Sequence, residues 1–367
     1  MVKLRDYLCY NFQMQHKEVF RILENFAPLK LALPGDNCGL QLGSLNDKTK
    51  GILVCVDVSK ATIKQAIAKK ANLIVSHHPI KTSDKGLQAS GPLWEILKPA
   101  IKKDSTIIAM HTNYDIAHGG LNDYLCKTLE LTNIQILQPT YIEKLFKLVT
   151  FVPQAALEKV RYAICSAGAG NIGNYSDCTF LSHGIGTFYA GKKTHPKSGK
   201  KGQLNRVGEA RLETIIPESK LLAVVSALLK AHPYEEPAYD IYPLLNQGRV
   251  IGIGRVGMLK NKMSFQSFCN LVTKKLKPEL IVPHGKGQVK KVAVSSGSGR
   301  GVIENVINSG ADTFVTGELN HHARLLAMDY GINLIEAGHY DTEICFVDVV
   351  RKLFKESLYN ANVYYAG

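Results

Sequence analysis

Five side chains that could bind divalent metal ions follow three strands predicted from the sequence. The strands and the residues after them are 72–76 with His77 and His78, 106–111 with Asp115, and 333–336 with His339 and Glu343. Imidazole and carboxylate groups are ligands of zinc, iron and manganese. The carboxyl ends of parallel strands form the ligand-binding edge of an open α/β sheet, so we expect the five side chains to converge. Five such ligands suit two cations, which activate one water when they lie about 4 Å apart.

The adjacent pair His77 and His78 supports two ions rather than one. Neighbouring side chains on extended backbone point to opposite sides, and Pro79 favours extended geometry at His78. Each histidine should therefore take a different position or a different metal. If residues 340–343 open the last helix, His339 and Glu343 lie one turn apart on one face. The structural alternative is a hydrogen-bonded histidine pair at a strand end.

Other polar motifs are less specific. His322, which with His321 begins a helix, is a candidate for holding a ligand in place or moving a proton, or it is a surface residue. His111 is a second such candidate, although a buried, hydrogen-bonded histidine is the better interpretation. The loop 296–301 could cradle a phosphate but lacks the full glycine spacing. The run 232–236 could present acid and base groups, and a turn entering an edge strand is the better interpretation.

The order of elements predicts a parallel α/β protein with an inserted module. A strand at 51–58, a helix at 60–70 and the strand at 72–76 form a βαβ crossover, which implies a parallel sheet. From about residue 140, two strand-helix-strand passes with hairpins indicate a ferredoxin-like α+β module of about a hundred residues. After about residue 257 the sequence again predicts alternating strands and helices, as in a parallel α/β fold.

Composition sets the class of protein. The 367 residues allow two or three domains, and 45% hydrophobic residues is ordinary for a globular protein. Eight cysteines without a CxxC pair indicate reduced thiols. No signal peptide or long apolar run is evident, so we expect a cytoplasmic protein without membrane contact. The net charge of +14 favours anionic partners. No aromatic-interleaved basic motif appears, so nucleic-acid binding is possible but not favoured.

The motifs together resemble one family, the GTP cyclohydrolase 1 type 2 homologues, also called Nif-three-like proteins. The resemblance covers nearly the whole chain. Its motifs in order are DNCGL at 36–40, SHHP at 76–79, HTNYD at 111–115, AGAGNIGNY at 167–175, AHPYEEP at 231–237, TGELNHH at 316–322 and AGHYDTE at 337–343. Cys38 stands where a valine is usual, and Glu318 stands where an aspartate is usual.

The resemblance implies a fold, a site and an assembly. The fold is an α/β metal-binding domain in two parts, residues 1–140 and 257–367, with an inserted ferredoxin-like domain at 141–256 that resembles the PII and CutA modules. The implied dinuclear ligand set is the same five residues, and the metal could be zinc, iron or manganese. The implied assembly is a toroidal homohexamer.

Two functions follow as hypotheses. The first is metal-dependent hydrolysis, in which a water activated by two divalent cations attacks a purine nucleotide such as GTP or a related substrate. The alternative is a metal-binding regulator or metal-delivery protein without turnover, which the PII/CutA-like insert favours. Nucleic-acid binding is a third possibility, and steep salt dependence would identify it.

Overall fold

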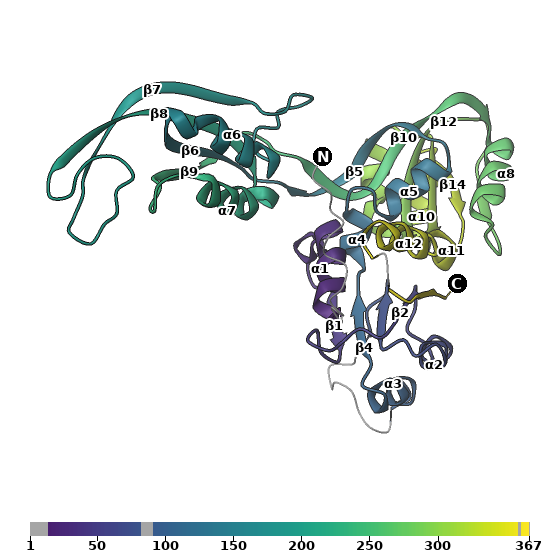
Figure 1. The fold of residues 1–367 in the computed structure, drawn as a ribbon. Helices are drawn as coiled ribbons and strands as arrows, with labels where there is room; N and C mark the ends of the chain where they lie inside the picture. Colours follow the sequence, from purple (N-terminus) through teal and green to yellow (C-terminus); the bar gives the residue numbers. More distant parts are fainter. Residues whose placement is uncertain (1–13, 82–90, 359–360, 367) are drawn as a thin grey trace. The chain divides into compact units, whose positions relative to one another are not determined.

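The computed structural model describes residues 14–81, 91–358 and 361–366. The chain divides into two compact units (Figure 1). The host unit comprises Met1–Thr140 and Ile251–Gly367, and the insert unit is Tyr141–Val250. The sequence-based interpretation ended the insert at residue 256, whereas the structure divides the chain within one long strand, β10 (Val250–Ser264). In the described ranges no helix has the length and apolar character needed to cross a membrane.

The amino-terminal half of the host unit is built on a five-stranded sheet with the order β1-β4-β3-β2-β15. Its strands are β1 (Gly39–Leu42), β2 (Ile52–Cys55), β3 (Leu73–Ser76), β4 (Thr106–Ala109) and β15 (Val363–Tyr365). All are parallel except β1. Every residue of β2, β3 and β4 is buried, as expected for parallel strands covered on both faces. Helices α2 (Lys60–Ala68) and α3 (Pro92–Lys102) make the crossovers, and Ile63 and Leu97 pack against Leu53 and Ile74.

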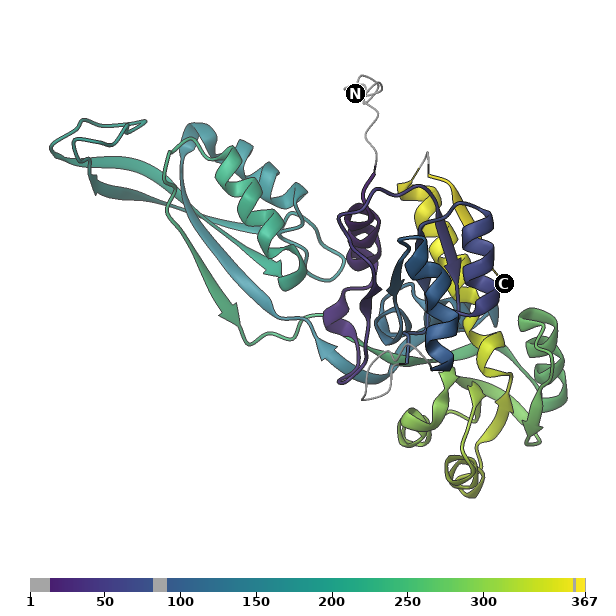
Figure 2. The same cartoon turned by 90° about the horizontal axis from the view of Figure 1, so that it is seen from below.

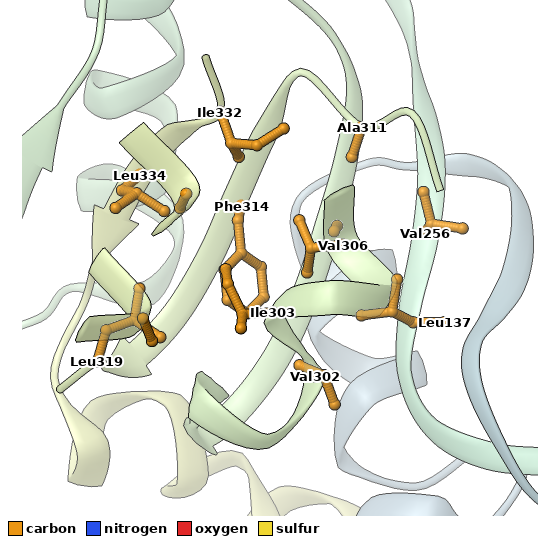
Figure 3. Close-up of a cluster of buried hydrophobic side chains, with 13 residues drawn as sticks. Leu137, Val256, Val302, Ile303, Val306, Ala311, Phe314, Leu319, Ile332 and Leu334 are labelled. Atoms are coloured by element: carbon orange, nitrogen blue, oxygen red, sulfur yellow. The ribbon is translucent and has the colours of Figure 1, made fainter. Parts of the chain in front are cut away.

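The carboxyl-terminal half is built on a six-stranded sheet with the order β11-β14-β13-β12-β10-β5. The strands are β5 (Thr132–Ile142), β10, β11 (Val282–His284), β12 (Gln288–Ser298), β13 (Thr313–Glu318) and β14 (Asn333–Glu336). The middle three, β12, β13 and β14, are parallel, while β11 and β10 pair antiparallel to them. Phe314 of β13 lies among Ile303, Val306 and Leu319 in the core (Figure 3). Helices α8 (Phe265–Leu276), α9 (Ile303–Asn308) and α10 (His321–Asp329) connect these strands, with a 3₁₀ turn, η4 (Gly299–Val302), before α9.

Six helices remain in the described part of the host unit. They are α1 (His16–Phe26), η1 (Leu29–Leu31), α4 (Thr112–Ile116), α5 (Leu121–Thr128), α11 (His339–Glu343) and α12 (Cys345–Ser357). Helix α12 contacts β2 of the first sheet, and α5 contacts both α12 and β12 of the second sheet. Helix α12 is amphipathic, and Val347, Val350 and Phe354 are on its buried face.

The insert unit is an antiparallel sheet with two helices on one face (Figure 2). Its elements run β6 (Leu145–Pro153), η2 (Gln154–Ala156), α6 (Leu157–Ser166), β7 (Thr179–Tyr189), β8 (Leu204–Pro217), η3 (Glu218–Lys220), α7 (Leu221–Ala231) and β9 (Tyr239–Leu244). The strand order β7-β8-β6-β9 is that of a ferredoxin-like fold, as predicted. The glycines at 184 and 186 lie inside one continuous ladder between β7 and β8.

A buried ion pair ties α5 to β10 within the host unit. Arg255 is 2% exposed, and its Nε and Nη2 donate to the two carboxylate oxygens of Asp123 at 2.6 and 3.1 Å. Its Nη1 donates to the carbonyls of Gly252 and Gly254. Burial by itself would raise the pKa of Asp123, but the guanidinium outweighs that effect and holds the pKa below its ordinary value.

We expect Asp123→Asn to lower the free energy of unfolding by about 3 kcal/mol at neutral pH, because it leaves a buried guanidinium without its counter-charge. The folded pKa of Asp123 is depressed, so its stabilisation is complete above the ordinary carboxyl range and is lost as pH falls through the folded value. The gap between wild type and variant should therefore narrow below about pH 4. Urea denaturation at several pH values measures this gap.

The matched control is Asp348→Asn, which removes the partner of Arg351 in an exposed pair on α12. We expect it to cost less than about 1 kcal/mol. Equal losses of stability in the two variants would contradict the role assigned to the Arg255 pair.

Candidate metal centre

Two strand edges bring their polar residues to one place. The carboxyl ends of the parallel strands are aligned at Cys55, Ser76 and Ala109 in the first sheet and at Ser295, Thr316 and Glu336 in the second. Within a few residues of these positions the chain carries imidazole, carboxylate or hydroxyl groups. Side chains from both edges then meet, as the ligand-site rule for open α/β sheets predicts.

The carboxylate of Glu343 lies at the centre of the cluster. Its Oε1 is 3.2 Å from Nε2 of His339 and 3.7 Å from Nε2 of His77, and its Oε2 is 2.9 Å from Nε2 of His78. The predicted one-turn spacing of His339 and Glu343 is present, because both lie on the short helix α11. Three imidazoles from two sheets therefore surround one carboxylate whose side chain is 4% exposed.

Asp115 is held at the edge of this cluster by the carboxyl end of β12. Its Oδ2 lies 3.9 Å from Nε2 of His77, and its Oδ1 accepts a 2.6 Å hydrogen bond from the Ser296 hydroxyl. Asn122 completes the support, since it donates to the Asp115 carbonyl and accepts from the Ser296 backbone N–H, both at 2.9 Å. The Asp115 carboxylate is therefore positioned by two elements far apart in sequence.

Each imidazole of the cluster is oriented by an oxygen at its Nδ1. The pairs are His77 with the Met110 carbonyl at 2.9 Å, His78 with Asp57 at 2.8 Å, His111 with Asp36 at 2.9 Å and His339 with Glu318 at 3.1 Å. An oxygen acceptor fixes the proton on Nδ1, which leaves Nε2 with a free lone pair when the ring is neutral. Metal-binding histidines are oriented in this way.

Two buried atoms of the cluster have no hydrogen-bond partner. They are Nε2 of His77 and Oε2 of Glu343, although Nε2 of His78 lies 2.9 Å from that oxygen. Leaving such atoms unpaired is costly, so a cation between them would satisfy both. In the described part of the chain, two groups of side chains have ligand atoms close enough to hold a metal ion: His77, His78 and His111, and His78, His339 and Glu343.

The charges of the cluster depend strongly on one another. Burial favours the neutral form of His78, but Asp57 and Glu343 outweigh it and raise the pKa of His78 to about 10. Glu343 is the main reason that the pKa of His339 is raised to about 9. Burial would raise the pKa of Glu343, yet the three imidazoles hold it well below its ordinary range. Burial raises the pKa of Asp115, and the nearby imidazole of His77 offsets this effect only in part. The site thus stabilises positive charge beside Glu343, as protons or as a metal ion.

Gly297 allows the carboxyl end of β12 to pass close to Glu343. It has φ of +56°, and a Cβ there would lie 2.2 Å from Oε1 of Glu343 and 3.2 Å from Nε2 of His339. Its backbone N–H donates to the Thr342 hydroxyl. A side chain at this position would fill the space beside the carboxylate, so glycine is required both by backbone conformation and by room.

The cluster has a buried side and an open side. The side chains of His77, Asp115 and Glu343 are 0%, 8% and 4% exposed, whereas those of His78, His111 and His339 are 23%, 27% and 37% exposed. The carboxylates therefore lie in the interior, and the half-exposed imidazoles border the solvent. A small molecule could approach from the imidazole side.

The structure brings the five predicted ligands together. Of the two further candidates, His111 lies at the cluster and His322 lies away from it. His111 was predicted to support the metal ligands, but its own ring nitrogen is close enough to those of His77 and His78 to bind the same ion. His322 is exposed on the first turn of α10 and contacts the ring of His321, and in the described residues no contact links it to the cluster.

Sequence reasoning missed the residues that orient the ligands. Asp57 and Asp36 hold His78 and His111, and Ser296 holds Asp115. The loop containing Ser296 and Gly297 had been considered only as a weak phosphate cradle. Asp57 follows the buried run of β2, so the strand-end rule used for the ligands could have identified it.

Comparison with known proteins agrees with this fold. The family model described as Duf34/NIF3 (NGG1p interacting factor 3) matches residues 14–365. The protein from Bacillus subtilis named GTP cyclohydrolase 1 type 2 homolog is 42% identical over 340 residues, which is 92% of this chain and 91% of that protein. The protein of the same name from Halalkalibacterium halodurans is 40% identical over 351 residues, or 94% of each chain.

A solved structure gives the same result in three dimensions. The Bacillus cereus protein related to NIF3 matches with a TM-score of 0.89 and 39% identity, covering 96% of this chain and 97% of that one. Both the sequence match and the structural match extend over the host unit and the insert unit. The chain is therefore a member of the Duf34/NIF3 family, whose curated relatives are named GTP cyclohydrolase 1 type 2 homologs.

Proposed function

We propose that this protein holds two divalent cations and is a metal-dependent hydrolase. The observation that carries the proposal is the arrangement around Glu343, whose two oxygens face different imidazoles. The two groups of ligand atoms are adjacent, and the carboxylate of Glu343, rather than an imidazole that binds a single ion, would bridge two neighbouring ions. The ligands proposed are His77, His78, Asp115, His339 and Glu343. Imidazole and carboxylate donors fit zinc, iron or manganese.

The chemistry proposed is hydrolysis. Two bound cations at this site would supply a water made nucleophilic at neutral pH. Asp115 and Glu343 contribute the negative charge that offsets the cations, and their burial excludes bulk water from that side. His78, His111 and His339 border the open side, where an electrophilic carbon or phosphorus of a substrate could be placed.

We propose a purine nucleotide such as GTP, or a related compound, as the substrate. The names of the curated relatives support this choice, and the net charge of +14 favours an anionic compound. A metal-binding regulator without turnover is the competing hypothesis, and the second experiment below separates the two.

The first experiment measures metal content. We expect elemental analysis of the purified wild type to give two divalent ions per chain and Glu343→Gln to give a large loss of both, because the amide lacks the shared charge. His322→Ala replaces an exposed histidine outside the cluster and should retain the wild-type content. Equal metal contents in the wild type and Glu343→Gln would refute the proposed centre.

The second experiment measures turnover. The metal-loaded wild type is assayed against GTP, other nucleotides and phosphoesters, with His77→Ala as the test and His322→Ala as the control. We expect hydrolysis to fall about a hundredfold or more in His77→Ala, because removing a proposed ligand should cost at least as much as removing a residue that only orients one, which typically costs about 10- to 100-fold. Metal binding without any hydrolysis in the panel would favour the regulator hypothesis.

The third prediction concerns Gly297. We expect Gly297→Ala to weaken metal binding about tenfold or more, because the added methyl must displace Glu343 or the loop. Isothermal titration with Zn²⁺ measures the effect. Gly301→Ala is the matched control, since a Cβ at Gly301 meets open space and its backbone φ is ordinary. The steric argument is wrong if both variants bind Zn²⁺ alike.

A further inference from the structure

The insert unit contains a cavity that the proposed metal site does not use. It has a volume of about 450 Å³, which is the size of a small-molecule site. It is bordered by the end of β7, the lysine-rich loop at 190–198, the middle of β8 and the segment at 234–238. That last segment belongs to the HPYEE run, which the sequence analysis interpreted as a turn.

The walls of the cavity are aromatic. Phe151, Phe188, Tyr189 and Tyr234 line it. Phe151 pairs with Arg211 of β8, and the neighbouring residues Val152, Ala210 and Leu212 belong to the core beneath α6 and α7. Because side chains alternate along a strand, Phe151 faces away from the two helices. The cavity therefore lies on the helix-free face of the insert sheet.

The polar lining of the cavity is predominantly acidic. The lining contains three carboxylates, those of Glu209, Glu235 and Glu236, against one lysine, Lys197. His195 also lines the cavity, and its backbone N–H donates to Glu235. The other lysines of the loop do not line the cavity. The chain as a whole carries a net charge of +14, but the cavity carries an excess of negative charge. The cavity should therefore favour a positively charged ligand.

Glu209 is fixed in position from two sides. Its Oε1 accepts a 2.8 Å hydrogen bond from the Tyr234 hydroxyl. Its Oε2 lies over Gly186, where a Cβ would come within 2.0 Å of it. A carboxylate held between an aromatic hydroxyl and a glycine that makes room for it is a preorganised acceptor rather than a freely moving surface group.

We propose that this cavity binds a small organic cation with N–H donors, such as an alkylammonium or a guanidinium compound. Aromatic faces attract cations, and the carboxylates accept hydrogen bonds from the N–H groups. In the described residues, neither group of metal-ligand side chains includes a residue of the cavity, so an organic cation fits it better than a metal ion. The hydrophobic parts of the ligand would contact Phe151 and Phe188.

The test is binding to the full-length protein by isothermal titration at physiological ionic strength. The probes are agmatine, which carries a guanidinium and an ammonium, choline, which lacks N–H donors, and AMP, which is anionic. We expect agmatine to bind more tightly than choline and AMP not to bind in the cavity. Tighter binding of AMP that depends on Lys197 would overturn the proposal in favour of an anion site.

Paired variants decide whether Glu209 is responsible. Glu209→Gln keeps the shape and an acceptor for Tyr234 but removes the charge, so we expect agmatine affinity to fall about tenfold. Glu213→Gln is the matched control on the same face of β8, where Glu213 pairs with Lys147 and Arg211 outside the cavity. Equal affinities in the two variants, or no agmatine binding by the wild type, would refute the proposal. Thermal denaturation confirms that both variants are folded.

Discussion

The arrangement of the host unit depends on one buried carboxylate shared by imidazoles from two sheets. Glu343 lies within 3.7 Å of His77 after β3 and within 3.2 Å of His339 on its own helix. An ionised carboxylate with little solvent contact is stable only beside positive charge. The two sheets must therefore keep their carboxyl ends close together, and the packing of α5 and α12 between β12 and β2 maintains that distance.

Much of the host fold could be predicted because its buried strands are short, apolar and bounded by polar residues. The strand predicted at 333–336 is β14 with the same bounds, and the crossover from β2 through α2 to β3 is parallel as expected. Strands β5 and β10 were missed because their apolar residues do not alternate regularly and many are exposed or half-buried. Their strand character depends on pairing across the sheet, which no local pattern encodes.

The candidate site also has a part that could be predicted from the sequence and a part that could not. The ligands could be predicted because histidines and carboxylates at strand ends are chemically conspicuous, and the family motifs pointed to the same five residues. The residues that orient them could not, because Ser296 and Asp115 are separated by 181 positions and meet only in the folded chain. The role of Gly297 could not be predicted either, because the glycine is needed to leave room for Glu343, and the two residues are neighbours only in the folded chain.

The route by which the chain enters and leaves the insert unit has an evolutionary consequence. Strands β5 and β10 are neighbours in the six-stranded sheet, and a Cβ at Gly252 would meet the carbonyl of Gln138. The two points at which the host chain is interrupted are therefore adjacent, like the arms of a hairpin. A shorter ancestor with a simple turn at this position could have gained the whole module in one genetic insertion without repacking either host sheet.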